Sequence, residues 1–272
     1  ETGLRYDPEL LARAARYGWP LLGGGVAMFI LGNCDRWFLA AAVSSETLAH
    51  YALAAKLATI VALAMQPFGL WWNARRIRVL QEVDGQRRSA EAVAWGFACL
   101  AIGAIWVANV VPTIITFALP SAYSHSIKWL PCLVLIVAMN ETSALLNVSA
   151  YTGKRATAAL IVNGCGAVTA LIGYILLTPE FGVAGVIIAT ILGHSVRIAA
   201  YGIHGARYAP IPYRWLAMAG TTTLAFITIQ SAQALDSGMA RLLLMLISSF
   251  AIVAIAAIGR NKHVLSIDAS PA

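Results

Sequence analysis

Long apolar runs alternate with short polar connections along the whole chain. Eight such runs lie at about 19–42, 51–72, 92–117, 129–151, 157–177, 182–202, 214–233 and 239–259. A helix needs about 20 mostly apolar residues to cross a bilayer, and each run approaches that length. Turn-forming residues stand after several runs, among them Gly85, Gly153, Pro179 and Pro210. The pattern predicts an all-α, polytopic bundle of eight transmembrane helices, without a connection long enough to form a separate folded domain.

Composition excludes a soluble domain. Of 272 residues, 60% are hydrophobic and 11% are charged, whereas roughly 25% of the residues in soluble domains are charged. The net charge of +7 does not indicate nucleic-acid binding, because the basic residues lie between the apolar runs, where topology and anionic lipids account for them. The four cysteines fall inside apolar runs without metal-like spacing. We interpret them as small buried hydrophobic residues and expect no metal and no cofactor.

Basic residues in the connections predict the orientation. Fourteen of them fall on one side of the membrane and two on the other, and the alternation holds at every connection. The fourteen are Arg5, Arg13, Arg16, Arg75, Arg76, Arg78, Arg87, Arg88, Lys154, Arg155, Arg207, Arg214, Arg260 and Lys262. Because positive charge collects in cytoplasmic loops, we expect both ends to be cytoplasmic. The chain is then expected to divide into a cytoplasmic lead-in at 1–16, a six-helix transporter lobe at 17–202, two additional transmembrane helices at 203–259 and a cytoplasmic tail at 260–272.

Three charged residues lie inside the first two runs at matching depths. Asp35 and Arg36 are six or seven residues from the outer end of the first run, and Lys56 is about six residues into the second. At ~1.5 Å per residue all three lie roughly 9 Å below the outer surface, so they can meet. Two interpretations stay open. Asp35 could neutralise a cation and lock two helices together, or the surplus cation could face a water-filled cavity and receive an anionic group.

A further carboxylate, Glu141, falls near the centre of the fourth run beside Asn140, Ser143 and Asn147. It either binds a coupling proton or Na⁺ near a cavity, or stays neutral and packed. We expect Arg197 to extend toward the cytoplasmic surface.

Asn163 and His194 read as isolated polar groups, each satisfied by hydrogen bonds between helices.

Residues 17–73 resemble a known family. The segments that carry the resemblance are YGWPLL at 17–22, NCDRWFL at 33–39, YALAAKLA at 51–58, QPF at 66–68 and WW at 71–72. They are similar to the start of the C-terminal lobe of polysaccharide (O-antigen type) flippases, in the multidrug/oligosaccharidyl-lipid/polysaccharide exporter superfamily.

The resemblance implies two lobes that open alternately to each face of the bacterial inner membrane. It also implies a cationic cavity between the lobes, for the pyrophosphate of an undecaprenyl-linked oligosaccharide. Arg36 and Lys56 match charged positions of that cavity, and Asp35 is carried over with them. The chain begins at Glu1 without a signal peptide, so we expect an N-terminal lobe of the same protein upstream.

The expected function is therefore transport, without covalent chemistry: a flippase for lipid-linked repeat units of O-antigen or exopolysaccharide. An ion gradient could drive it, with Asp35 or Glu141 as the coupling group and Asn140 beside it. A peptidoglycan-precursor or multidrug exporter of the same fold is the alternative. A membrane-embedded glycan polymerase or ligase is less favoured, because it would need a substantial outer loop. A non-transporting scaffold is also less favoured, because it would not need charges within the bilayer.

Overall fold

The computed structural model describes residues 7–151, 157–235 and 237–261, and every regular element in these ranges is helical. The elements are α1 (Pro8–Asn33), α2 (Asp35–Ala42), α3 (Ser45–Ala58), α4 (Ile60–Gln81), α5 (Gly85–Ala118), η1 (Ser121–Trp129), α6 (Leu130–Leu146), η2 (Asn147–Tyr151), α7 (Thr157–Phe181), α8 (Val183–Tyr208), α9 (Trp215–Gln233) and α10 (Gly238–Asn261). Residues 1–6 and 262–272, parts of the predicted lead-in and tail, lie outside the described residues, as does the predicted basic connection at 152–156.

Six helical segments of the described chain are long and apolar enough to cross a membrane: Ser45–Gln81, Gly85–Ala118, Ser121–Tyr151, Thr157–Phe181, Val183–Tyr208 and Gly238–Ile258. The other two predicted runs are also helical, as α1 with α2 and as α9. Glycines in α1 and threonines in α9 lower the hydropathy of these two runs. The all-α polytopic bundle predicted from the sequence is confirmed.

Helix boundaries differ from the prediction in three places. The first helix begins at Pro8, inside the predicted lead-in, because the Asp7 side chain accepts hydrogen bonds from the backbone N–H groups of Glu9 (2.9 Å) and Leu10 (3.1 Å). Pro179 does not end its helix, since α7 continues through it to Phe181. The last helix of the predicted six-helix unit, α8, continues to Tyr208.

The first two predicted runs are each interrupted. The break between α1 and α2 falls at Cys34, and the break between α3 and α4 falls at Thr59, where neither proline nor glycine stands. At the second break the Thr59 hydroxyl donates to the backbone carbonyl of Lys56 at 2.5 Å. Both breaks bring polar residues to the middle of the bundle.

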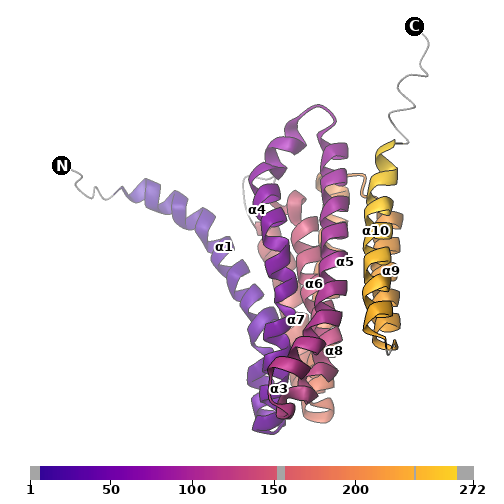
Figure 1. Ribbon diagram of the computed structural model, residues 1–272. Coiled ribbons are helices and arrows are strands. Elements are labelled where there is room, and N and C mark those ends of the chain that lie inside the picture. The colour runs from indigo at the N-terminus through magenta and orange to yellow at the C-terminus, as the bar shows by residue number, and fades with distance from the viewer. Residues whose placement is uncertain (1–6, 152–156, 236, 262–272) are drawn as a thin grey trace, which may run out of the picture.

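The helices form one main core with a smaller one beside it. Helices α7 and α8 pack most extensively, and α1 lies along α7 and then leans away from the bundle toward its N-terminus (Figure 1). Small residues allow the close approach of α7 and α8: a Cβ on Gly173 would lie 2.6 Å from the Cβ of Ala189. A separate cluster that includes Ile105, Met245 and Ile252 joins the α9–α10 pair to α5.

The α4–α5 connection lies at one end of the bundle, and α3 and the α9–α10 connection lie at the other, as the predicted alternation requires (Figure 1).

The prediction for the cysteines was wrong for three of them. Cys34 alone is buried, whereas Cys99, Cys132 and Cys165 are exposed, and all four are free thiols. Apolar character fixes membrane depth, but it does not fix which face of a helix a cysteine occupies.

Candidate functional site

A cavity of about 280 Å³ lies where the breaks in the first two spans meet α6 and α8. Asp35 and Arg36 line it from α2, Tyr51 and Thr59 from the second span, and Asn140 from α6. Thr190 and His194 of α8 also line it, so polar side chains from four of the predicted runs surround one space inside the bundle. The structure brings together three of the five predicted site residues, Asp35, Arg36 and Asn140.

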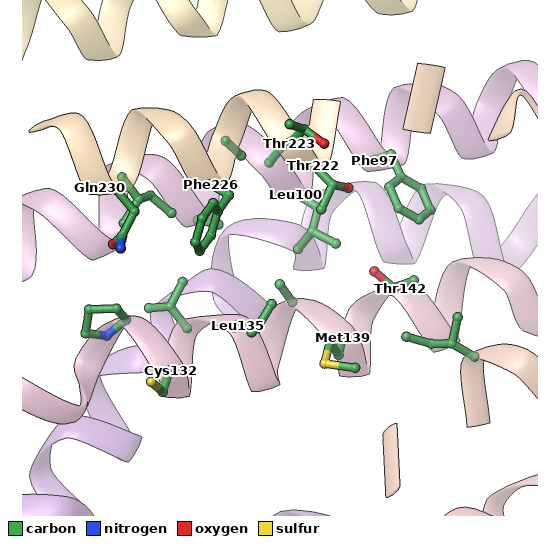
Figure 2. Close-up of a pocket in the computed structure, with 18 residues that line it drawn as sticks. Phe97, Leu100, Cys132, Leu135, Met139, Thr142, Thr222, Thr223, Phe226 and Gln230 are labelled. Carbon is green, nitrogen blue, oxygen red and sulfur yellow. The ribbon is translucent and has the colours of Figure 1, made fainter. Parts of the chain in front are cut away.

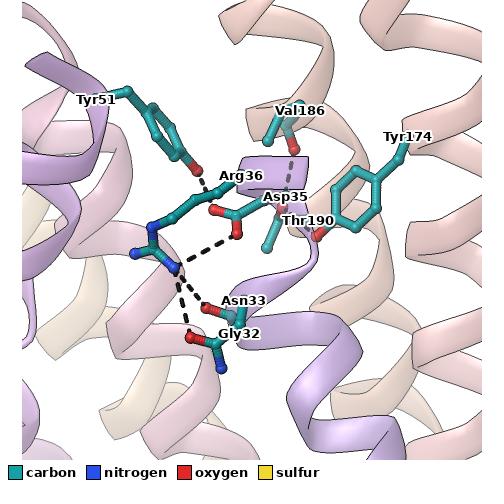
Figure 3. Close-up of polar contacts among 8 residues, drawn as sticks. All are labelled: Gly32, Asn33, Asp35, Arg36, Tyr51, Tyr174, Val186 and Thr190. Atoms are coloured by element: carbon teal, nitrogen blue, oxygen red, sulfur yellow. Dashed lines mark hydrogen bonds and ion pairs between the residues drawn. The ribbon is translucent and has the colours of Figure 1, made fainter. Parts of the chain in front are cut away.

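The carboxylate of Asp35 is buried and held from two sides. The Tyr51 hydroxyl donates to its Oδ2 at 2.6 Å, and Nη1 of Arg36 lies 3.6 Å from its Oδ1 (Figure 3). Asp35 is 7% exposed. The breaks position these groups, because Asp35 opens α2 directly after Cys34, and Tyr51 reaches it from α3. Tyr51 rather than Lys56 joins α3 to Asp35, and the ion pair with Arg36 lies within α2.

Arg36 lies beside this carboxylate with its guanidinium at the edge of the cavity. Its Nη1 donates weakly to the backbone carbonyl of Gly32 (3.4 Å) and to Oδ1 of Asn33 (3.5 Å) (Figure 3). The side chain is 32% exposed. No acceptor among the described residues takes its Nε or Nη2 protons, so a guanidinium with five N–H donors has capacity left for an anionic ligand.

Lys56 does not join the pair, so the three charges that matching depth would allow to meet do not all meet. Its side chain is exposed and makes no ion pair with any described residue. The reason is rotation rather than depth. Tyr51, Ala55 and Thr59 face the cavity at four-residue spacing, and Lys56 follows Ala55 by a single residue, about 100° around the helix.

Asn140 connects the cavity to the predicted carboxylate. Its Nδ2 donates to Oε1 of Glu141 at 3.3 Å, and its Oδ1 accepts from Nη1 of Arg197 at 3.1 Å. Glu141 is half-buried and lies outside the residues that line the cavity. The arrangement therefore links Glu141 to the cavity only through the neighbouring amide.

The other members of the predicted polar stripe point elsewhere. The Ser143 hydroxyl donates back to the carbonyl of Met139 at 3.0 Å. Asn147, at the start of η2, accepts a hydrogen bond from the Arg76 guanidinium. Because α6 ends at Leu146, the i, i+3, i+7 spacing of a continuous helix does not extend to Asn147.

Arg197 does not extend to the membrane surface; it is buried, at 3% exposed, at the centre of a polar network. Its Nε donates to Oδ1 of Asn163 at 3.1 Å, its Nη1 lies 3.0 Å from Nδ1 of His194, and the Tyr201 hydroxyl donates to the same Asn163 oxygen at 3.0 Å. Asn163 and His194, which read as isolated polar groups, thus share one partner. His194, Arg197 and Tyr201 follow one another at helical spacing on α8, which was the available sequence signal.

This network stands behind the wall of the cavity. Asn140 and His194 line the cavity and also bond to Arg197. Gly166 of α7 provides the space for the arginine, because a Cβ there would lie 2.3 Å from Cγ of Arg197. The buried Arg197 guanidinium therefore lies directly behind the Asn140 amide and the His194 imidazole, two groups that line the cavity.

The site combines a buried carboxylate, a partly exposed guanidinium with free donors and neutral polar groups, all within the spans. Such a set can bind an anionic group and can hold a proton or small cation at Asp35, and it offers no activated nucleophile. No family model, curated protein or solved structure matches this chain.

Proposed function

We propose that this chain is part of a flippase that moves undecaprenyl-pyrophosphate-linked oligosaccharide across the bacterial inner membrane by alternating access. In this proposal the diphosphate binds at Arg36, and the exposed Lys56 attracts it from the open side of the passage. A diphosphate is best held by desolvated, charge-assisted donors, and a guanidinium presents several in one plane.

The observation that carries the proposal is a polar, exposed face on the second span beside the cavity. Lys56 in α3, Thr59 at the break and Gln66 in α4 are all exposed, within a segment long enough to cross the membrane. Charged and amide side chains at this depth are costly against lipid tails, so this face is expected to border water or another part of the transporter. A passage for sugars needs such a wall.

Coupling to an ion gradient is the second part of the proposal. Asp35 is buried, and the Tyr51 hydroxyl and the Arg36 guanidinium contact separate oxygens of its carboxylate. Protonation would weaken the contact to Arg36 and free the guanidinium for the diphosphate. Glu141 acts on the same cavity only through Asn140, so Asp35 is the first candidate for the coupling group.

The test is export of surface polysaccharide by cells that carry Arg36→Ala and Lys56→Ala together. We expect export to be abolished while the protein remains in the membrane at its normal level. Arg78→Ala together with Arg207→Ala is the matched control, because these exposed arginines lie outside the cavity and lose the same charge. Export at the wild-type rate by the Arg36/Lys56 variant would reject the assigned role.

A reconstituted assay identifies the substrate class. Purified protein in vesicles should translocate a labelled polyprenyl-pyrophosphate oligosaccharide, and unlabelled compounds of the same class should compete. Competition by cationic drugs alone, without effect of the lipid-linked sugar, would instead indicate a multidrug exporter.

A further inference from the structure

A second cavity, separate from the candidate site, lies in the seam between α6 and α9. Both helices pack on α5, but they form no packed interface with each other. The space left between them has a volume of about 610 Å³, within the range of cavities that hold small ligands. We call it the α6–α9 groove. Its floor includes Leu100 and Ala104 of α5, and its walls include Leu135 of α6 and Phe226 of α9.

The groove is lined almost entirely by apolar side chains (Figure 2). No charged side chain lines it, and the polar ones are three threonines and Gln230. The Thr222 hydroxyl already donates to the backbone carbonyl of Met218 at 2.9 Å. Gln230 and Cys132 lie at one end, and Phe97 and Thr142 lie toward the other (Figure 2). The predominantly apolar lining therefore favours a hydrocarbon ligand, and Gln230 offers an amide to a polar group at one end of the groove.

The length of the groove corresponds to one leaflet of a bilayer. Along α6 its lining runs from Pro131, the second residue of the helix, to Thr142. These twelve residues are separated by eleven helical steps, which span about 16 Å, about half of the ~30 Å hydrocarbon core. The helices of its floor and of the α6 wall are candidate membrane spans. The groove therefore lies along candidate membrane spans and has the length of one leaflet.

The groove does not communicate with the candidate site. The two cavities share no lining residue, and they lie on opposite faces of α6. Ile136 and Asn140 face the candidate site, whereas Leu135 and Met139 face the groove. A tail attached to a diphosphate at Arg36 would have to pass around α6 to enter it. A lipid of the surrounding bilayer enters it directly.

We propose that the α6–α9 groove holds one acyl chain of a membrane phospholipid, which fills the seam and holds the α9–α10 pair against the other helices. In a bilayer, helices associate mainly through close packing, and an unfilled groove loses those contacts on both walls. The chain supplies the contacts that α6 and α9 do not make with each other. The side-chain amide of Gln230 donates a hydrogen bond to an ester oxygen of that lipid. This proposal does not depend on the transport function.

The experiment reconstitutes the full chain with a phospholipid that carries a photoreactive diazirine in its acyl chain. After illumination, the crosslinked peptides are mapped by mass spectrometry. We expect crosslinks concentrated on the peptides of α6 and α9 that line the groove. Ala138→Phe or Thr223→Phe, from opposite walls, should fill it and lower these crosslinks about tenfold, which corresponds to a loss of roughly 1.4 kcal/mol of binding free energy.

Ala144→Phe is the matched control, because Ala144 is exposed on the same helix and lines neither cavity. It should leave the crosslinks unchanged, and circular dichroism checks that all three variants are folded. A parallel arm uses a polyprenyl phosphate with the same diazirine. Crosslinks in the groove from this probe alone, or equal labelling by the phospholipid of every lipid-facing helix, would overturn the proposal. So would full labelling of the groove in both filled variants.

Discussion

The hydroxyl of Tyr51 lies 2.6 Å from Oδ2 of Asp35 and joins α3 to α2 in the interior of the bundle. Tyr51 is 1% exposed and Asp35 is 7% exposed, so both groups are largely shielded from bulk solvent. A hydrogen bond to a buried carboxylate is charge-assisted, and removing its donor leaves an acceptor unsatisfied. This single contact therefore contributes to the orientation of the first two spans as well as to the charge of the cavity.

Tyr51→Phe should lower the free energy of unfolding by about 1–3 kcal/mol, because Asp35 then keeps only the longer contact to Arg36. The measurement is thermal unfolding in detergent. Tyr213→Phe is the control, since the Tyr213 hydroxyl is buried and has no hydrogen-bond partner among the described residues. Equal melting temperatures for the two variants would contradict the importance of the Tyr51–Asp35 bond.

Arg36 and Lys56 should contribute unequally to anion binding if the proposed function is right. Arg36 lines the cavity with free donors, whereas Lys56 is exposed beside it. Arg36→Ala should weaken binding of undecaprenyl pyrophosphate by about 10- to 100-fold, as expected for a charge-assisted hydrogen bond. Lys56→Ala should change it by less than about fivefold, since exposed charges are screened. Titration of each purified variant with undecaprenyl pyrophosphate measures these affinities. Equal losses of affinity in the two variants would show that Lys56 binds the diphosphate as strongly as Arg36 does.

Sequence reasoning predicted which runs form long helices, but it did not predict how each helix is rotated about its axis. The apolar runs dictate the spans, because no other element satisfies its backbone within lipid. Asp35 and Lys56 do lie at similar positions along their spans, but one faces inward and the other outward. A helix turns by about 100° per residue, so the breaks at Cys34 and Thr59 change which residues face each other. Neither break is marked by proline or glycine.

Arg197 was misjudged for a related reason. Its place near the end of a run is compatible with a side chain that reaches the surface, and only the packing of α7 against α8 decides otherwise. Acceptors on two other helices, Asn163 and Asn140, surround the guanidinium. Asn163 looked isolated in the sequence because its partner Arg197 lies 34 positions away.

Gly166→Ala tests how tightly this network is packed. The added methyl group would lie 2.3 Å from Cγ of Arg197 and 2.8 Å from the backbone oxygen of Gly193, so the arginine or the helix must move. Overpacking of this kind costs about 1–3 kcal/mol, and thermal unfolding should show a lower melting temperature. Gly25→Ala is the control, because nothing lies within 4 Å of its Cβ position. Alanine there should leave stability unchanged or raise it by about 0.5–1 kcal/mol. A Gly166→Ala protein as stable as the wild type would mean that Arg197 can leave its partners freely.

The attachment of α10 depends on Arg214, which stands just before α9. Its Nη1 donates to the backbone carbonyl of Ala256 at 2.9 Å, and its Nη2 donates to that of Ile255 at 3.3 Å. Arg214→Ala removes both bonds, at a cost of about 1–3 kcal/mol, and should loosen the end of α10. Hydrogen exchange followed by mass spectrometry should show faster exchange in the peptide that contains Ile255 and Ala256, with no change in α7 or α8.

Arg207→Ala provides the comparison for Arg214, because Arg207 is an exposed arginine in the last turn of α8. It removes the same charge near the same end of the bundle and should leave exchange in α10 unchanged. Faster exchange in both variants would attribute the effect to net charge rather than to the two carbonyl contacts. If exchange rises in α10 only for Arg214→Ala, these contacts fix one end of the α9–α10 pair. The hydrogen bond between Thr228 and Ser248, at 2.8 Å, joins α9 to α10 farther along the pair. The α6–α9 groove is then the part of the contact between this pair and the other helices that protein atoms do not fill.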